Sequence, residues 1–382
     1  MVIETLGQGG AEQMLVSLLP ALKRRGIGCQ VVALWQPYDL ALPLSDQGID
    51  VCKVGMSHRW MLPEAIFKLF AICLRERPDV IWGHLYIATL CTRLLKLMLP
   101  RTVVVSSLHS LAYSNYPAST RWKRIRRKLD MITGGVLSDR IVAVSQAVAD
   151  DYTKHLGWED INVIHNAVSV CQPLDLTPSE KLEERARFDV KFEDFLIVLP
   201  ARHVEIKGHR YLIEAVKILT DSDEMSIRLI APGNGSLRMG LQSTVDCLGL
   251  GDRIHLVDAL PQQALFRLIQ AADIVAMPSL SEGLCVAAVE AMALGKPIVL
   301  TAVGGNVELV EHDTSALLVP AKNPTALAEA IRKLQRYPEL RVRLGRNASK
   351  RARDLFDIEH IADRWVAEFA EILDCKKNKI HS

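Results

Sequence analysis

The feature that most constrains the fold is an alternation of short apolar runs with amphipathic stretches of helical length. In the first half of the chain the runs are CQVVALW, DVIWGH, TVVVSS, RIVAVS and NVIHN. Alternation of such buried strands with helices is typical of a parallel sheet covered on both faces. The first half therefore predicts an α/β domain, whose first strand is an unusually short run at residues 2–4.

The same pattern then starts again with FLIVLPA, IRLIAP, RIHLVD, DIVAMPS and PIVLTA. We therefore predict two doubly wound, Rossmann-like α/β domains, residues 1–168 and 191–355, joined by a polar linker at 169–190. Ligands bind beyond the carboxyl ends of the strands in such sheets, and two facing domains form a cleft. Residues 356–382 read as an amphipathic helix that we expect to pack back on the first domain.

Composition narrows the class of protein. The chain has 382 residues, 49% of them hydrophobic and 24% charged, as is ordinary for a globular protein. A formal net charge of +2 gives no general affinity for nucleic acid. The eight cysteines show no metal-binding spacing, which favours reduced thiols in the cytoplasm. No signal peptide or membrane-spanning run is recognisable, so we expect a cytoplasmic protein.

Two glutamates, Glu282 and Glu290, stand eight residues apart in the apolar stretch PSLSEGLCVAAVEAMALGKP. Glu282 is expected just before a helix and Glu290 about two turns inside it, a separation of about 12 Å. Paired glycosidase carboxylates lie about 5–9.5 Å apart, so this spacing argues against an acid/base pair. It suits an extended ligand with a phosphate at the helix N-terminus between the two carboxylates. The alternative is an ordinary helix with a solvated Glu290.

Cations and glycines occur at other expected strand ends. Arg202 and Lys207 follow FLIVLP and suit a diphosphate, although two solvated loop cations are the alternative. Glycine-rich turns follow the first strand (GQGG) and IRLIAP (GNG), where backbone can approach a ligand closely or simply turn.

Four motifs occur in one order: GGAE, R-x4-K followed by Gly, GNGSLR, and the E-x7-E stretch. Together they resemble the family-4 retaining glycosyltransferases of the GT-B fold. VSQAV, VIHNAV and TAVGGNVELVEHDTSALLVP are further matches, so the resemblance covers essentially the whole chain. The chain departs from the family at GNGSLR, which is usually GDGPLR, and at Ala201 and Ala259, where glycine is commoner.

The resemblance implies roles for the matching residues. Arg202 and Lys207 would neutralise the leaving diphosphate, and Glu282 and His109 would lie beside the transferred sugar. His84, in IWGHLY, is a weaker candidate. The implied residues that bind the nucleotide sugar are Gly9, Gly10, Gly233, Asn234, Gly283, Leu284, Cys285 and Glu290.

The resemblance further implies that residues 1–168 bind the acceptor and residues 191–355 bind the nucleotide sugar. It also implies a reaction. A hexose or N-acetylhexosamine is moved with retention from a nucleotide sugar, expected to be a UDP-sugar, to a glycan or lipid-linked acceptor. The pathway expected is surface polysaccharide (such as lipopolysaccharide) or glycolipid biosynthesis. The two cations would take the place of a metal ion, and the sequence lacks a DxD triplet, so we expect no cofactor. The alternatives are a sugar-nucleotide epimerase or phosphorylase on the same fold and a noncatalytic partner of another transferase.

One basic segment, RWKRIRRK, bears on the acceptor. Such a segment can lie on an anionic membrane or meet a lipid-linked diphosphate, which would place the protein at the inner face of the membrane. The alternative is a solvated helix face. Its basic residues are Arg121, Lys123, Arg124, Arg126, Arg127 and Lys128.

Overall fold

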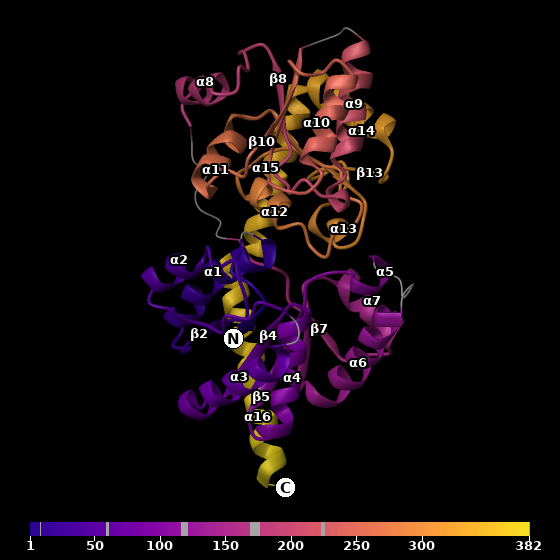
Figure 1. Ribbon diagram of the computed structural model, residues 1–382. Coiled ribbons are helices and arrows are strands. Elements are labelled where there is room, and N and C mark those ends of the chain that lie inside the picture. The colour runs from indigo at the N-terminus through magenta and orange to yellow at the C-terminus, as the bar shows by residue number, and fades with distance from the viewer. Residues whose placement is uncertain (8, 59–60, 116–120, 169–175, 223–225, 382) are drawn as a thin grey trace. The chain divides into compact units, whose positions relative to one another are not determined.

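The computed structural model describes residues 1–7, 9–58, 61–115, 121–168, 176–222 and 226–381 (Figure 1). The chain divides into two compact units. The first unit combines Met1–Ala167 with Ile358–Ser382, and the second is Val168–Asp357. Each unit is built on a parallel sheet, as the two series of apolar runs predict.

The sheet of the first unit has the strand order β3-β2-β1-β4-β5-β6-β7. Its strands are β1 (Val2–Ile3), β2 (Gln30–Ala33), β3 (Asp50–Lys53), β4 (Val80–His84), β5 (Val103–Leu108), β6 (Arg140–Ala143) and β7 (Ile161–Val163). Its helices are α1 (Gly10–Arg24), α2 (Ala41–Asp46), α3 (Leu62–Glu76), α4 (Tyr86–Met98), α5 (Ala112–Asn115), α6 (Arg121–Leu137), α7 (Gln146–Leu156) and α16 (Ile358–His381).

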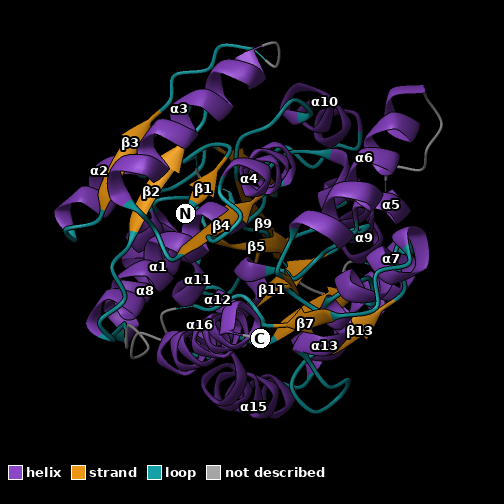
Figure 2. Cartoon of the chain, turned by 90° about the horizontal axis from the view of Figure 1, so that it is seen from below, coloured by secondary structure: helices purple, strands orange, loops and turns teal. Residues whose placement is uncertain are grey.

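Successive residues of a strand point to opposite faces of the sheet, and residues of both faces are buried here. Ile3 and Val31 belong to a core shared with α1 and α16. Val2 and Val32 belong to a second core shared with α3 and α4. Figure 2 shows α1 and α3 on opposite sides of these strands. This double burial explains why the strands read as continuous apolar runs.

The first strand is as short as the sequence predicts. β1 has two residues and pairs in parallel with β2 and β4, with Val2 opposite Val32 and Gly83. Two residues are enough here because both neighbours supply backbone partners, so β1 lies in the middle of the sheet rather than at its edge.

The last helix, α16, is an integral part of the first unit (yellow in Figure 1). The Trp365 ring lies 4.2 Å from the ring of Trp82 in β4, centre to centre, and Phe369 packs on both. Arg25, after α1, forms ion pairs with Glu359 and Asp363, each at 2.6 Å. Aromatic burial of this kind is worth roughly 1.5–3 kcal/mol per side chain.

The sheet of the second unit has the order β10-β9-β8-β11-β12-β13. Its strands are β8 (Phe195–Val198), β9 (Ile227–Pro232), β10 (Ile254–Val257), β11 (Ile274–Met277), β12 (Ile298–Thr301) and β13 (Leu317–Val319). Its helices are α8 (Pro178–Ala186), the 3-10 turn η2 (Glu205–Lys207), α9 (His209–Asp221), α10 (Arg238–Cys247), α11 (Gln262–Ala271), α12 (Val286–Ala293), α13 (Asn306–Leu309), α14 (Pro324–Arg336) and α15 (Pro338–Phe356).

The segment expected to be a linker is partly folded. Residues 169–175 lie outside the described residues, whereas residues 178–186 form α8 within the second unit. Thr177 and Glu180 cap this helix reciprocally. Arg185 forms an ion pair with Asp273 at 2.7 Å and donates to the carbonyl of Ala271 at 3.0 Å. These contacts explain why α8 belongs to the second unit.

Among the described residues, no helix is both long enough and apolar enough to cross a membrane.

Candidate functional site

The charged residues predicted for the second unit follow neighbouring strands. Arg202 and Lys207 come after β8, and Glu282 comes after β11. Gly233 and Asn234 come after β9, on the other side of β8. Because these strands are parallel, the five residues lie at one edge of the sheet. This is the carboxyl-end edge, where doubly wound folds bind their ligands.

The half-buried Lys207 forms an ion pair with the buried Glu282, with 2.7 Å between Nζ and Oε1. Ser279 donates its hydroxyl to the same carboxylate oxygen at 2.7 Å, and Thr301 in turn donates to the carbonyl of Ser279 at 2.5 Å. Burial lowers the pKa of Lys207, but the Glu282 carboxylate outweighs this and holds that pKa above its ordinary value. Lys207 is therefore a fixed positive charge that has ammonium hydrogens left for a ligand.

Arg202 differs from Lys207 in its surroundings. Its side chain is exposed, and no ion pair holds it within the part of the chain that the structure describes. Its positive charge is close enough to act on the pKa of Lys207. The edge therefore carries one half-buried cation and one exposed cation, and both could donate charge-assisted hydrogen bonds to a diphosphate.

The loops that carry these residues pack directly on one another. A Cβ added at Gly233 would lie 2.1 Å from the carbonyl oxygen of Ala201, and one at Gly208 would lie 2.0 Å from that of Pro278. Gly208 also has a φ of +68°. The backbone of Leu280 donates to the carbonyl of Ile206 at 2.8 Å. Glycine is therefore needed at these positions for contact between loops, whatever ligand approaches them.

Two of the residues that depart from the family pattern, Ala201 and Asn234, lie in these loops. Ala201, where glycine is commoner, is the residue against which Gly233 packs. Asn234, which replaces the family's acid, accepts from the backbone N–H of Ala259 at 3.3 Å through its side-chain oxygen. The backbone carbonyl of Asn234 accepts from the N–H of His203 at 3.0 Å. Asn234 thus orders the loop after β8, which sequence reasoning did not foresee.

The N-terminus of α12 lies immediately after Glu282. Gly283, Leu284 and Cys285 are buried, and the N-cap residue Cys285 makes no capping bond with its side chain. Burial raises the pKa of the Cys285 thiol to about 12, so this thiol stays protonated. A helix N-terminus without a side-chain cap presents backbone N–H groups and a positive dipole, which favour phosphate.

Glu290 lies in α12, as its spacing predicts. Its side chain is half-buried, and burial raises its pKa to about 7, against a smaller opposing effect of a hydrogen bond from Gln262. A solvated carboxylate would keep its ordinary pKa, so the interpretation as a freely solvated Glu290 is the weaker one. Gln262, at the start of α11, is a neighbour that sequence reasoning missed.

The glycine turn of the first unit leads into α1. Gly9 is the N-cap of this helix without a side-chain capping bond, and Gly10 is its first residue. A Cβ at Gly9 would lie 2.3 Å from a carboxylate oxygen of Glu12, which accepts from the hydroxyl of Thr5 at 2.9 Å. Glycine at position 9 therefore leaves room for the buried side chain of Glu12, which is a structural explanation for the GGAE motif.

His109 is paired with His84, the weaker sequence candidate. Their nitrogens Nε2 and Nδ1 lie 3.0 Å apart, and the remaining nitrogen of each ring is buried without a partner among the described residues. Burial lowers the pKa of His109 to about 4 and that of His84 well below its ordinary value. Both rings are therefore neutral near pH 7. The His84 ring packs at a tilt against Trp82, with 4.3 Å between ring centres.

The basic segment forms the first half of α6, but its cations do not share one environment. Arg126 stacks on the ring of Tyr86, with 3.8 Å from the guanidinium carbon to the ring centre, and Arg127 donates to the carbonyl of His155 at 3.0 Å. Lys123 is half-buried. The exposed cations of the segment are Arg121, Arg124 and Lys128, and the exposed apolar side chains that repeat along the helix are Ile125, Leu129, Ile132 and Val136.

Within the described ranges, no group of three His, Cys, Asp or Glu residues is arranged to hold a metal ion. Sequence reasoning missed the supporting residues Ser279, Thr301 and Glu12. Ser279 lies three residues before Glu282 in PSLSE, so proximity in sequence was the available clue. Thr301 lies 22 residues beyond Ser279, so the sequence offered no clue to the contact between them.

Two protein families match the chain, one mostly within each unit of the fold. The family described as Glycosyltransferase Family 4 matches residues 8–171, and the family described as Glycosyl transferases group 1 matches residues 180–351. The two matches thus correspond to the first and the second sheet, respectively.

Two individual glycosyltransferases are similar in sequence to this chain. An uncharacterised glycosyltransferase of Methanocaldococcus jannaschii is 26% identical over 371 residues, covering 94% of this chain and 93% of the relative. A D-inositol 3-phosphate glycosyltransferase of Streptomyces avermitilis is 30% identical over 257 residues, covering 64% of this chain and 54% of that enzyme. The chain thus spans about half the length of the latter.

A solved structure shows the same fold. Anabaena HepE in complex with UDP-glucose matches with a TM-score of 0.83 and 22% identity, covering 98% of this chain and 100% of that chain. The solved structure shares the GT-B fold. The two glycosyltransferase families together match most of the chain, and the chain therefore belongs to the family-4 glycosyltransferases.

Proposed function

We propose that this glycosyltransferase moves a hexose or N-acetylhexosamine from a UDP-sugar, with retention and without a metal ion. The acceptor is a glycan or lipid-linked molecule of surface polysaccharide or glycolipid biosynthesis. The observation that carries the proposal is the Lys207–Glu282 ion pair just before the N-terminus of α12, which has no side-chain cap.

The charges of this edge suit the parts of a nucleotide sugar. Lys207, Arg202 and the N-terminus of α12 offer positive charge and hydrogen-bond donors to a diphosphate. Glu290 offers a carboxylate to ribose hydroxyls, and Glu282 one to the transferred sugar. The complex of Anabaena HepE with UDP-glucose, a structure of the same fold, supports a UDP-sugar as the donor.

The proposed step needs no covalent intermediate. The acceptor hydroxyl oxygen forms a bond to the anomeric carbon as the bond from that carbon to the diphosphate oxygen breaks. The hydroxyl proton passes to the departing diphosphate on the same face of the sugar. Lys207 and Arg202 stabilise the negative charge that develops on the diphosphate. Glu282 already accepts from Lys207 and Ser279, which favours a positioning role over that of a nucleophile.

Thermal unfolding with a panel of nucleotide sugars tests the donor. The panel is UDP-glucose, UDP-galactose, UDP-N-acetylglucosamine and GDP-mannose, each with EDTA. A ligand at 100 times its Kd stabilises the folded chain by about 2.7 kcal/mol, so a UDP-sugar should give the largest rise in Tm. The proposal is wrong if no UDP-sugar stabilises the chain, or if stabilisation disappears with EDTA.

NMR of the transferred product tests retention: the anomeric configuration of the donor should persist. Inverted product contradicts the mechanism. Epimerised nucleotide sugar formed without an acceptor would assign the epimerase alternative, and bound donor without turnover would assign the noncatalytic one.

We also propose that the enzyme lies at an anionic, cytoplasmic membrane surface through α6. The exposed stripe of Ile125, Leu129, Ile132 and Val136 beside exposed cations supports this location. In flotation with vesicles containing anionic lipid, the chain should float at low salt, and Leu129→Ser/Ile132→Ser should reduce flotation several-fold. A chain that stays in the soluble fraction at low salt contradicts the proposal.

A further inference from the structure

The short helix α5 follows His109 along the chain and is held by a carboxylate of α7. Asp151 accepts from the backbone N–H groups of Tyr113 and Ser114, each at 3.0 Å, and from the hydroxyl of Ser114. Figure 1 shows α5 next to α7, as these hydrogen bonds require. The two oxygens of one side chain thus bind three donors of α5, which fixes the backbone of this helix.

Asp151 is buried, with only 1% of its side chain exposed. A buried carboxylate is costly unless donors surround it, and α5 supplies three donors here. His155 makes another contact, with 3.3 Å from its Nδ1 to the carboxylate. The neighbouring Asp150 is exposed and accepts from the side chain of Gln146 at 2.8 Å. These adjacent acids of α7 differ in burial and in partners, so Asp150 is a matched control for Asp151.

A second carboxylate holds the ring of Tyr113. The hydroxyl of Tyr113 donates to Asp130 of α6 at 2.5 Å, and Asp130 forms a buried ion pair with Arg93 of α4. Burial and the charge of Asp130 raise the pKa of Tyr113, so its hydroxyl stays protonated and able to donate. Tyr113 is therefore held through its backbone by Asp151 and through its hydroxyl by Asp130.

This placement of α5 reaches His109 because the connection between them is short. β5 ends at Leu108 and α5 begins at Ala112, so His109 lies in a connection, residues 109–111, with both ends fixed. Its Nε2 lies 3.0 Å from Nδ1 of His84, and burial lowers the pKa of His109 to about 4. A shift of α5 would therefore move the ring of His109, break its contact with His84 and admit water.

We infer that Asp151 is a positioning residue, whose carboxylate fixes α5 and thereby holds the ring of His109 against His84. The inference rests on the proposed function only where it predicts an effect on turnover. The placement of His109 can be measured without any substrate, so the two proposals fail separately.

The first test follows the imidazole Cε1–Hε1 signals of the full chain by NMR against pH, without ligand. His109→Gln identifies the signal of His109, which should stay that of a neutral ring down to about pH 4 in the parent chain. An amide nitrogen cannot accept a hydrogen bond, so Asp151→Asn should loosen α5 and let water reach His109. The pKa of His109 should then rise by at least about one unit. Asp150→Asn should leave it unchanged.

Tyr113→Phe keeps the test open if Asp151→Asn fails to fold. This variant keeps the backbone bonds to Asp151 and loses only the hydroxyl bond to Asp130, so the pKa of His109 should rise in the same direction by a smaller amount.

Turnover tests the consequence of the placement. If the chain is an active transferase, kcat should fall about 10-fold in Asp151→Asn, because a ring displaced from its place contributes less. The Kd of the donor should stay that of the parent chain, because the proposed donor contacts of Lys207 and Glu290 lie in the second unit.

Three outcomes decide between the proposals. The same pKa of His109 in the parent chain and both variants overturns the positioning role, whether or not the chain is active. An equal rise in Asp150→Asn assigns the effect to lost charge and also overturns it. A pKa of His109 that rises in Asp151→Asn alone of the two acids, in a chain that neither binds nor turns over a nucleotide sugar, supports the positioning role and contradicts the proposed function.

Discussion

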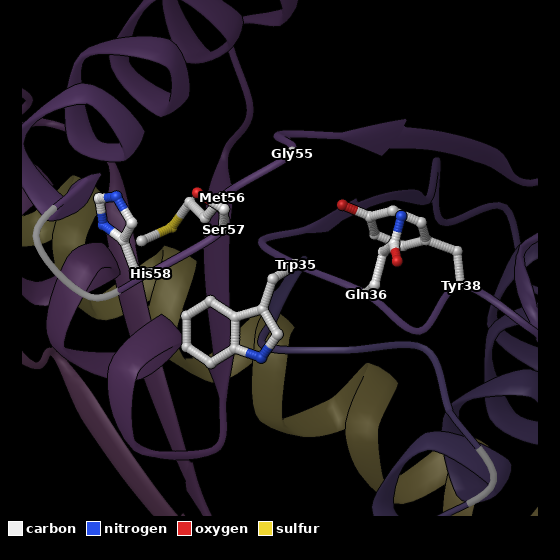
Figure 3. Close-up of a pocket in the computed structure, with 7 residues that line it drawn as sticks. All are labelled: Trp35, Gln36, Tyr38, Gly55, Met56, Ser57 and His58. Carbon is white, nitrogen blue, oxygen red and sulfur yellow. The ribbon is translucent and has the colours of Figure 1, made fainter.

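The carboxyl-end edges of the two sheets carry different chemistry, although the sheets are built alike. In the second unit this edge holds charge: Lys207 is ion-paired with Glu282, and Arg202 is exposed beside them. In the first unit it holds the neutral histidines His84 and His109 and a pocket whose described lining includes Trp35 and Tyr38 (Figure 3).

Under the proposed function, this difference would suit the two sheets to two different substrates. A diphosphate requires cations that stay charged, and the ion pair keeps the pKa of Lys207 high despite burial. In the first unit, burial keeps both histidines neutral by lowering their pKa, so they offer uncharged hydrogen-bonding nitrogens. The comparison therefore predicts large effects for charge removal in the second unit and small ones in the first.

The largest effect is expected for Lys207→Met. Loss of a fixed cation that faces the developing charge should reduce kcat by roughly 100- to 1,000-fold. It also leaves Glu282 buried without its partner, so the second unit should lose about 3–5 kcal/mol of stability. The double variant Lys207→Met/Glu282→Gln should recover stability without recovering kcat. Wild-type turnover in the single variant contradicts the assigned role.

Glu290→Ala should have the next largest effect. A hydrogen bond to a charged group contributes about 1.5–3 kcal/mol, so the Kd of the UDP-sugar should rise roughly 10- to 100-fold. Isothermal titration measures it, with the exposed Glu339→Ala as a control in the same unit. An unchanged Kd contradicts the ribose contact.

The pH dependence should distinguish the two units. The pKa of Glu290 is raised to about 7, so its contribution to stability is present below pH 4.5 and is lost as pH rises toward 7. The histidines have lowered pKa values, so their part of the stability is present above pH 6.5 and is lost as pH falls toward 4.

UDP-sugar affinity should accordingly rise by up to about 10-fold between pH 6 and pH 8, as Glu290 ionises. Glu290→Gln should remove this dependence and raise Tm at pH 8. A pH profile that is the same in the Gln variant assigns the titration to another group.

The smallest effect is expected for His84→Asn. His84 holds the ring of His109 through one neutral hydrogen bond, worth about 0.5–1.5 kcal/mol, so kcat/KM should fall roughly 2- to 10-fold. In His84→Phe, which keeps a ring but loses the same hydrogen bond, kcat/KM should fall by a similar factor. An effect as large as that of Lys207→Met would contradict a neutral, positioning role.

Much of the fold was open to prediction because apolar periodicity marks strands that are buried on both faces. The two sheets, the short first strand and the place of Glu290 in a helix follow from such local patterns. The folded part of the expected linker was also within reach: Thr177 and Glu180 have the spacing of a capping box, which its polar composition hid.

Contacts between distant segments could not be predicted in this way. Lys207 and Glu282 are 75 residues apart, and their pairing depends on β8 and β11 being neighbours. His84 and His109 meet for the same reason at the ends of β4 and β5. The pocket at Trp35 requires two loops from adjacent strands, and no single stretch of sequence contains it.

We propose that cations of the second unit, rather than a metal ion, hold the diphosphate. Isothermal titration of the chain with UDP-glucose in EDTA tests it most directly, with Arg202→Gln as the comparison. We expect binding in EDTA that Arg202→Gln weakens at least 10-fold. Binding that appears only on addition of Mg²⁺, or that is the same in Arg202→Gln, would contradict it.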